Sequence, residues 1–137
     1  PDLIERAALK FGSQCITISI DVLGGQVAGR CGGQLARGSP VEWARTARNY
    51  GAGEILLNDV DRDGTLEGYN LDLIREVSKA IEIPVIACGG AGCPEDFTKA
   101  IQAGASAVAA GAMFAFTEET PLTVKRAMHE TGIAVRL

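Results

Sequence analysis

The 137-residue sequence has no long apolar run and few aromatic residues, which make up 5% of it. No stretch approaches the ~20 apolar residues that a membrane-spanning helix needs, and no basic segment followed by an apolar one begins the chain. Lysine and arginine (13) are outnumbered by aspartate and glutamate (17), so the net charge of -4 provides no basic field for a nucleic-acid backbone. These absences predict a cytoplasmic protein that binds neither membranes nor nucleic acids.

The cysteines and the single histidine do not suggest a metal site. Cys15 and Cys88 lie in strand-like apolar runs, where a free thiol behaves as a small hydrophobic group, and we expect these cysteines, Cys31 and Cys93 to stay reduced. Cys88 and Cys93 bracket the segment CGGAGC, but zinc would need further ligands, and His129 lies far along the chain in a helical pattern. We therefore expect no metal and no other cofactor, with His129 exposed near a helix end.

Helical patterns alternate with short apolar segments along the chain. With 47% hydrophobic residues, a chain of this length can bury one core, which predicts a single domain over residues 1–137. Three times a helical pattern ends at a glycine that can adopt the left-handed cap conformation, at Gly12, Gly51 and Gly104, and an apolar strand follows. We expect strands at 15–21, 54–61, 84–90 and 106–114, and two further helices at 71–81 and 121–131.

This alternation predicts an α/β fold with parallel strands covered by helices. In the first strand Ile18 and Ile20 should face the helices, whereas Thr17, Ser19 and Asp21 should face the other way. The second strand repeats the pattern, so the face away from the helices is partly polar. An open parallel sheet leaves two exposed edges, which predicts that the chain forms half of a larger closed sheet.

The polar residues suited to catalysis follow the carboxyl ends of the strands, where parallel α/β folds place their functional loops. Asp21 ends the first strand and could transfer protons, or it could only shape a turn. A glycine-rich segment, residues 22–38, follows it. We expect this segment to be a mobile lid or binding loop that contributes nothing to the core.

The stretch LLNDVDRDGTLEGYN, residues 56–70, places three carboxylates two residues apart directly after an apolar run. Asp61 and Asp63 precede a glycine, and they could take part in acid–base chemistry or only shape the turn. The calcium alternative falls away because the twelve-residue loop with a terminal glutamate is absent. What Asp59, Asp61 and Asp63 do is the question that this stretch raises.

Glycines at the ends of the third and fourth strands are suited to binding a phosphate. The backbone amides of Gly89 and Gly90 can approach a phosphate because no Cβ intervenes, and a helix that starts at Pro94 adds partial positive charge. A tight turn without a ligand would use the same residues. Gly111 follows the neighbouring strand, and in eight-stranded barrels the loops after the last two strands form the usual phosphate site, which favours phosphate binding.

Five segments together resemble the cyclase subunit of imidazole glycerol phosphate synthase: FGSQCITISID, GAGEILLNDVDRDGTLEGYNLDLI, PVIACGGAGCPEDF, AGASAVAAGAMF and TGIAVRL. The resemblance runs from Pro1 to Leu137 and corresponds to the second half of that subunit. It implies the C-terminal half of a (β/α)₈ TIM barrel, a fragment of a longer barrel with four parallel strands and covering helices. The family acts in histidine biosynthesis. It takes ammonia from a glutaminase subunit, acts on a phosphorylated ribotide, and forms imidazole glycerol phosphate and aminoimidazole carboxamide ribotide.

The resemblance also implies roles for individual residues. Asp21 matches a catalytic aspartate at the end of the fifth barrel strand, and Glu54 matches a glutamate of the charged gate where ammonia enters at the opposite end. Substrate contacts are implied for Asn58, Asp61, Asp63 and Gly64, and phosphate contacts for Gly89, Gly90, Gly111 and Ala112. Asn58 stands where the family usually has threonine, and Ala112 stands where it commonly has serine.

Three other functions stay open. A cyclase-like paralogue that works with a glutaminase in sugar amidation is compatible with these departures. The sister isomerase, which opens a sugar ring in the preceding step, shares the half-barrel and its main motifs, although GEILL, GGAG and GIAVR favour the cyclase. The third function is a phosphate-binding half-barrel without turnover. We expect this behaviour of the isolated chain, because half of the substrate site is missing.

Self-association is a further expectation. An open half-barrel exposes an inner face of mixed polarity, and a soluble monomer rarely tolerates a large surface of this kind. Two copies related by a two-fold axis could cover it, which predicts a homodimer or a larger assembly. A compact, well-folded monomer in sedimentation equilibrium at micromolar concentration would contradict this expectation.

Overall fold

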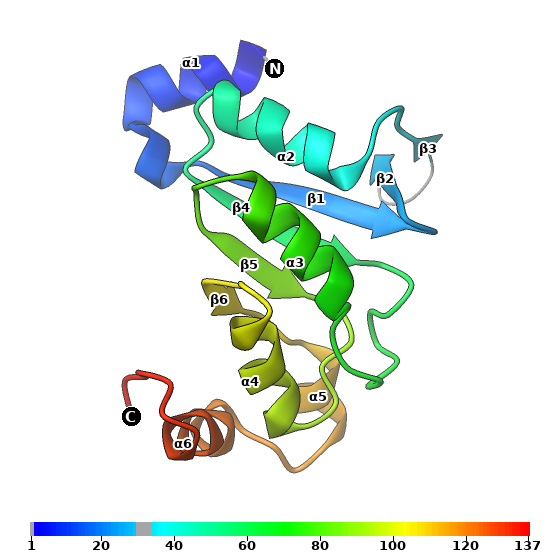
Figure 1. The fold of residues 1–137 in the computed structure, drawn as a ribbon, viewed down its shortest axis with the longest axis vertical. Helices are drawn as coiled ribbons and strands as arrows, with labels where there is room; N and C mark the ends of the chain where they lie inside the picture. The colour runs from blue at the N-terminus through cyan, green and yellow to red at the C-terminus, as the bar shows by residue number, and fades with distance from the viewer. Residues whose placement is uncertain (1, 30–33) are drawn as a thin grey trace.

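The computed structural model describes residues 2–29 and 34–137, which form a six-stranded sheet with helices packed against it (Figure 1). The strands lie in the order β3-β2-β1-β4-β5-β6. Four of them run parallel, as predicted: β1 (Thr17–Leu23), β4 (Glu54–Asp59), β5 (Val85–Cys88) and β6 (Ala107–Val108). The other two are antiparallel additions beside β1: β2 (Gln26–Gly29) and β3 (Gln34–Leu35).

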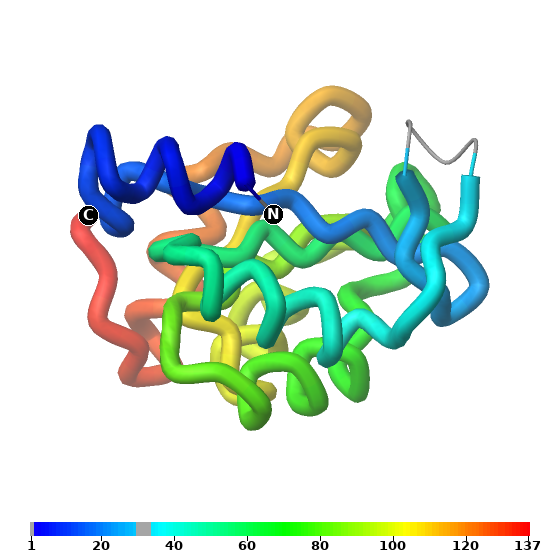
Figure 2. Tube along the Cα trace, turned by 90° about the horizontal axis from the view of Figure 1, so that it is seen from above, coloured from blue at the N-terminus to red at the C-terminus, as the bar shows by residue number. Residues whose placement is uncertain are grey.

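The helices alternate with the parallel strands. They are α1 (Asp2–Phe11), the 3₁₀ helix η1 (Ser13–Cys15), α2 (Pro40–Asn49), α3 (Leu71–Ala80), α4 (Pro94–Gln102), α5 (Ala112–Phe116) and α6 (Pro121–Glu130). Helices α2, α3 and α4 follow one another across the sheet, with α1 and α6 at its two ends (Figure 1). Seen from above, α2 and α3 lie on the same side of the strands (Figure 2). The α/β class, with the architecture of half a (β/α)₈ barrel, is therefore confirmed.

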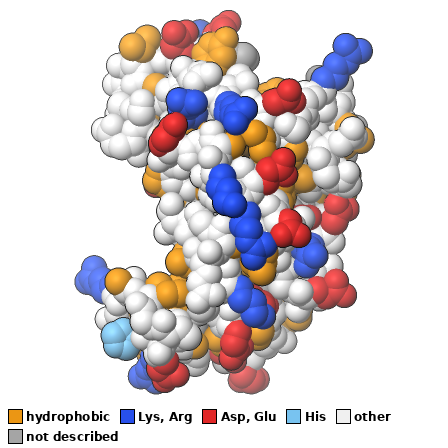
Figure 3. Space-filling view, viewed as in Figure 1, with side chains coloured by type: hydrophobic (Ala, Val, Ile, Leu, Met, Phe, Trp, Pro, Cys, Tyr) orange, Lys and Arg blue, Asp and Glu red, His pale blue; other side chains and the backbone are white. Residues whose placement is uncertain are grey.

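Strand side chains alternate between the core under the helices and the opposite face. Ile20 and Ile55, on the helix side, are 3% and 0% exposed, whereas Thr17 and Ser19 on the other side are exposed. The prediction of which side chains of the first strand face the helices is therefore confirmed. On the outer surface over the helices, basic and acidic side chains are interspersed (Figure 3), as is typical of a solvent-exposed layer.

The glycine-rich segment after β1 contains a β-hairpin, and the prediction that this segment contributes nothing to the core was wrong. Gly24 and Gly25 have positive φ values of 58° and 76°, which match a two-residue type I′ turn and reverse the chain directly after β1. Strand β2 then pairs with β1, and Val27 and Ala28 are both buried. The hairpin therefore extends the sheet beside the residue that we expect to be catalytic.

All four predicted strands have different limits in the structure, and the first and the last of them also lose residues to helices. Cys15 lies in the exposed helix η1, because β1 begins only at Thr17. In the segment SAVAAGAMF only Ala107 and Val108 form a strand, and a short helix begins at Ala112. Alanine and glycine carry little periodic signal, which explains why the sequence did not separate these elements. The cysteines of the described residues, Cys15, Cys88 and Cys93, are free, and Cys31 lies outside the described residues.

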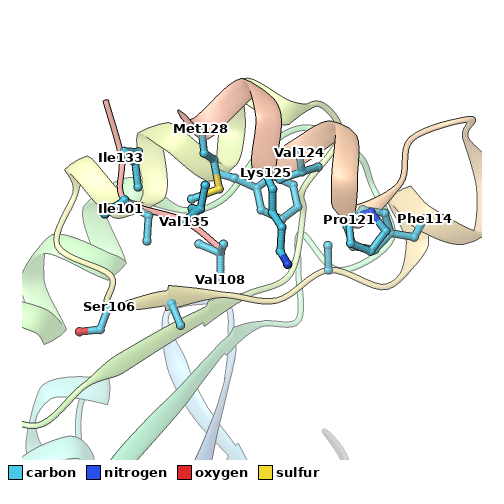
Figure 4. A pocket seen from close by; sticks show the side chains of 14 residues that line it. Ile101, Ser106, Val108, Phe114, Pro121, Val124, Lys125, Met128, Ile133 and Val135 are labelled. Carbon is cyan, nitrogen blue, oxygen red and sulfur yellow. The ribbon is translucent and has the colours of Figure 1, made fainter. Parts of the chain in front are cut away.

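Both ends of the parallel sheet carry apolar surface. Helix α1 has no buried residue, and its Leu3, Leu9 and Phe11 are 58–83% exposed. At the other end, β6 borders a groove of about 430 Å³ between α4, α6 and the C-terminal tail (Figure 4). Its lining is apolar except for Ser106 and Lys125. Association of two copies would cover such surfaces and stays a prediction. No helix within 2–29 and 34–137 is both long and apolar enough to cross a membrane.

Candidate functional site

The strand register places three side chains in one row near the carboxyl end of the sheet. Asp21 of β1 is aligned with Asn58 of β4, which is aligned with Cys88 of β5. All three are partly exposed, and the preceding row, which includes Ile20 and Leu57, is buried under the helices. The structure thus brings Asp21 and Asn58 together on the open face. Cys88, which the sequence pattern predicts to behave as a small hydrophobic group in an apolar strand, lies beside them.

The Asp21 carboxylate is held through one of its two oxygens. Its Oδ1 accepts a hydrogen bond from Ser19 Oγ at 3.2 Å and another from Asn58 Nδ2 at 3.3 Å. Within the described part of the chain, no group donates to Oδ2. Asn58 Oδ1 is buried and has no hydrogen-bond partner among these residues either. The row therefore presents one carboxylate oxygen without a hydrogen-bond partner, Asp21 Oδ2, whereas the unpartnered amide oxygen of Asn58 is buried.

Asp59, the first of the three alternating carboxylates, stabilises the loop after β4 through hydrogen bonds. Its side chain lies in the core and the residue is 5% exposed. Oδ1 accepts hydrogen bonds from the backbone N–H groups of Asp61 (3.1 Å) and Arg62 (3.3 Å), and Oδ2 accepts one from Asn70 Nδ2 (2.7 Å). Asn70 in turn caps α3 by accepting a bond from Leu73 N–H at 3.1 Å. Asp59 thus joins the start of the loop to its end.

The other two carboxylates lie beyond the strand and are exposed. Asp61 accepts a hydrogen bond from Gly24 N–H at 2.5 Å, which ties the loop to the turn of the hairpin. The Asp63 backbone donates to Asp59 O at 3.0 Å, and Gly64 continues the turn with a φ of 80°. Among the residues described, no group donates to the Asp63 carboxylate. Of the three alternating carboxylates, only Asp63 therefore has both side-chain oxygens uncommitted.

The pKa of the Cys88 thiol, at the end of β5, is raised by burial and by nearby acidic side chains. Burial raises the pKa of Cys88, and the charges of Asp63 and Asp21 raise it further, against a lowering effect of a hydrogen bond with the Gly89 backbone. Cys88 is therefore a neutral thiol at pH 7. Within ranges 2–29 and 34–137 no cluster of three or more potential ligands is suited to a metal ion.

The two glycines after β5 are required by local packing. Gly89 and Gly90 have φ values of 91° and 105°, which side chains of L-residues rarely adopt. A Cβ atom on Gly89 would collide with Asp59 O, and one on Gly90 would collide with Gly68 O. Gly68 N–H also donates to Gly90 O at 2.7 Å. The turn thus needs both glycines whether or not a ligand binds.

The start of α4 is already capped by one of its own side chains. Asp96 accepts hydrogen bonds from the backbone N–H groups of Gly92 (3.1 Å) and Cys93 (3.2 Å), and it forms a salt bridge with Lys99 at 3.2 Å. Burial by itself would raise the pKa of Asp96, but these partners outweigh it and lower the pKa. The two amides that Asp96 occupies directly precede α4 and are not those of Gly89 and Gly90, so phosphate binding at this end of the sheet stays a prediction.

The remaining predicted residues lie at two separate places. Gly111 and Ala112 begin α5 close to the end of β6, and a Cβ atom on Gly111 would meet nothing within 4 Å. This backbone is open to solvent. Glu54 lies at the opposite, amino end of β4, where its carboxylate accepts a hydrogen bond from Thr17 Oγ1 at 2.9 Å. The structure therefore separates Glu54 from the other predicted residues.

These observations define a class of protein: an α/β protein with the architecture of half a (β/α)₈ barrel, whose polar residues gather at the carboxyl ends of parallel strands. Comparison with known sequences is more specific. The chain belongs to the family described as histidine biosynthesis protein, whose sequence profile matches residues 1–120.

The chain is similar to curated proteins named imidazole glycerol phosphate synthase subunit HisF. It is 42% identical to the protein of Corynebacterium diphtheriae over 147 residues, which covers 99% of this chain and 57% of the relative. It is 46% identical to the protein of Dehalococcoides mccartyi over 142 residues, which covers 100% of this chain and 56% of the relative. The chain thus spans about half the length of the curated relatives it matches.

Proposed function

We propose that the chain supplies one half of a cyclase of histidine biosynthesis, a lyase that uses ammonia to form imidazole glycerol phosphate and aminoimidazole carboxamide ribotide. The observation that carries this proposal is the Asp21 carboxylate, which is held through Oδ1 and presents Oδ2 at the carboxyl end of the sheet. An aspartate held in this way can accept and return protons during ring closure. The name that the relatives carry supports the same reaction.

The phosphorylated ribotide binds along the row that starts at Asp21. Asn58 lies in this row and holds Asp21 through its amide nitrogen, and the exposed Asp63 provides a carboxylate for the polar groups of the substrate. Asp61 contributes by holding the hairpin turn through Gly24 N–H, so its part is to shape the site. Gly64 belongs to the same substrate loop. The phosphate group contacts the backbone at the ends of the last two strands, at Gly89, Gly90, Gly111 and Ala112.

Ammonia enters from the opposite end of the sheet, where Glu54 belongs to the proposed gate. The register supports this division, because Thr17 is aligned with Glu54 at one end of the β1–β4 pair and Asp21 with Asn58 towards the other. A glutaminase subunit that docks at the amino end could therefore deliver ammonia along the inner face to Asp21. This partner, like the cytoplasmic location of the reaction, is part of the proposal.

The single domain formed by residues 1–137 acts as half of a longer barrel. Its polar inner face, the apolar surface of α1 and the groove beside β6 support this view, because a closed barrel would cover all three. By itself the chain binds a phosphate ester without turnover, since the substrate site is shared with the other half. Pairing of two copies would cover the same surfaces.

The catalytic part of the proposal is tested in a chimera in which this chain replaces the matched segment of HisF from Dehalococcoides mccartyi. We expect Asp21→Asn to lower kcat by about 10²–10⁴-fold with ammonia as the nitrogen source, because the substitution removes a proton-transfer group. Asp72→Asn, on the exposed face of α3, is the matched control and should leave kcat unchanged. A normal kcat for the Asp21→Asn chimera would remove Asp21 from the mechanism.

Phosphate binding is tested with the isolated chain and inorganic phosphate, by calorimetry. Gly111 has an ordinary φ of -120° and open space around it, so replacement should not disturb the fold. Gly111→Asp places a negative charge at the proposed phosphate position and should weaken binding by about tenfold or more. Gly111→Asn has the same size without the charge and should bind more tightly than Gly111→Asp. Equal affinities for the two variants would contradict the proposed position.

A further inference from the structure

Two neutral side chains converge on the same oxygen of Asp21. Ser19 lies two residues earlier on β1, so its side chain points to the same face, and its hydroxyl donates to Oδ1 at 3.2 Å. Asn58, from the neighbouring strand, donates to Oδ1 at 3.3 Å. A carboxylate oxygen has two lone pairs that accept hydrogen bonds in its plane. These donors therefore use the acceptor capacity of Oδ1 and leave that of Oδ2 open.

The Asn58 amide lies between Asp21 and the turn after β5. Its Oδ1 lies next to Gly89, where an added Cβ atom would come within 3.1 Å of it. The amide oxygen therefore lies buried on the β5 side, and the amide nitrogen faces Asp21 on the β1 side. Asp21, Asn58 and Cys88 are aligned in adjacent strands, so the sheet itself sets this geometry.

We propose that Ser19 and Asn58 are positioning residues, which fix the carboxylate of Asp21 so that Oδ2 is the oxygen that exchanges a proton with the substrate. This inference rests on the proposed catalytic function of Asp21 and extends it to Ser19. The hydroxyl of Ser19 donates its hydrogen bond to Asp21, and not to the loop after β4 or to the glycine turns. Loss of either donor allows the carboxylate to rotate. The consequence is a lower rate of proton transfer with little change in substrate affinity.

The test compares Ser19→Val with Ser19→Thr in the chimera. Valine and threonine have nearly the same shape and both suit a strand, but only threonine keeps a hydroxyl. Both side chains add nearly the same volume at Ser19, so a steric effect would be shared by the two variants and their difference reports the hydroxyl. Ser19→Val should lower kcat by about five- to tenfold, the effect of one hydrogen bond, and change KM by less than about twofold, whereas Ser19→Thr should retain most of kcat. Equal kcat values for the two variants would overturn the role of Ser19.

A second measurement does not depend on turnover. In the isolated chain, the side-chain amide protons of Asn58 can be followed by ¹⁵N-edited NMR. Asp21→Ala should shift these resonances because it removes their acceptor, while Asp72→Ala on α3 should leave them in place. Unchanged Asn58 resonances in the Asp21→Ala variant would overturn the role of Asn58. If these shifts occur but Asp21→Asn keeps a normal kcat, the hydrogen bond is real and the catalytic proposal alone has failed.

Discussion

The two sides of the candidate site are built from different chemistry. On the β1–β4 side, side chains form the structure: Ser19 and Asn58 hold Asp21, and Asp59 holds the loop after β4. On the β5–β6 side the segments that follow the two strands, residues 89–92 and 109–112, consist of glycines and alanines, so the backbone forms the surface there. Gly89 and Gly90 allow the turn to pack against the loop after β4.

This difference separates residues that share a sequence motif. Asp59 and Asp63 belong to the same run of alternating carboxylates, but one is buried with three donors and the other is exposed. Gly90 and Gly111 were both predicted to contact phosphate, but only Gly90 is enclosed by packing. On each side, therefore, the fold depends on one residue of a pair, whereas the other can be replaced without disturbing the packing. Substitutions can break or sharpen this division.

The largest effect on stability is expected on the glycine side. Gly90→Ala should lower the free energy of unfolding by about 3 kcal/mol or more, because the φ of 105° is strained for alanine and the Cβ atom meets Gly68 O. Gly111→Ala should change it by less than about 0.5 kcal/mol, since the site is open. Urea unfolding of both variants measures the difference. Similar losses in the two variants would show that the two glycines do not differ in this way.

On the carboxylate side, Asp59→Asn should lower the free energy of unfolding by about 2 kcal/mol. The carboxylate of Asp59 accepts hydrogen bonds through both of its oxygens, and in asparagine one of these oxygens is replaced by an NH₂ group, which cannot accept them. The matched control is Asp63→Asn, which changes the same chemical group in an exposed position and should cost less than about 0.5 kcal/mol. Thermal unfolding followed by circular dichroism is sufficient. A stable Asp59→Asn variant would mean that the loop after β4 does not depend on this carboxylate.

The smallest effect concerns the cap of α4. Because partners lower the pKa of Asp96 below its ordinary value of 3.8, ionised Asp96 stabilises the fold above that pH. The contribution disappears as the pH falls through the lowered value. Between about pH 4 and pH 2, Asp96→Asn should therefore lose less stability than the wild type, by about 1 kcal/mol. The exposed Asp2→Asn variant is the control, and parallel curves for wild type and Asp96→Asn would contradict the prediction.

Much of the site could be predicted because strand alternation is a local property. The order of Ser19, Ile20 and Asp21 indicates which of them face the helices, and parallel strands must bring Asp21 and Asn58 to the same end. The same alternation also places Asp59 on the helix side, with Ile55 and Leu57. The signal for its structural role was therefore present in the sequence. What it did not contain was the partner, because Asn70 lies eleven residues further on.

The sequence by itself determined the α/β class, which strand side chains face the helices, and the helix ends that are marked by glycine. Each of these follows from short-range periodicity and backbone preference. Only the tertiary structure decided which of the chemically alike residues are free. The hairpin after β1 formed because its turn could pair β2 with β1 and bury Val27, which glycine content alone did not reveal. Likewise the Asp61 carboxylate accepts a hydrogen bond from Gly24 N–H, and the Asp96 carboxylate accepts hydrogen bonds from the N–H groups of Gly92 and Cys93, which directly precede α4. Such hydrogen bonds join groups that come into contact only when the chain has folded.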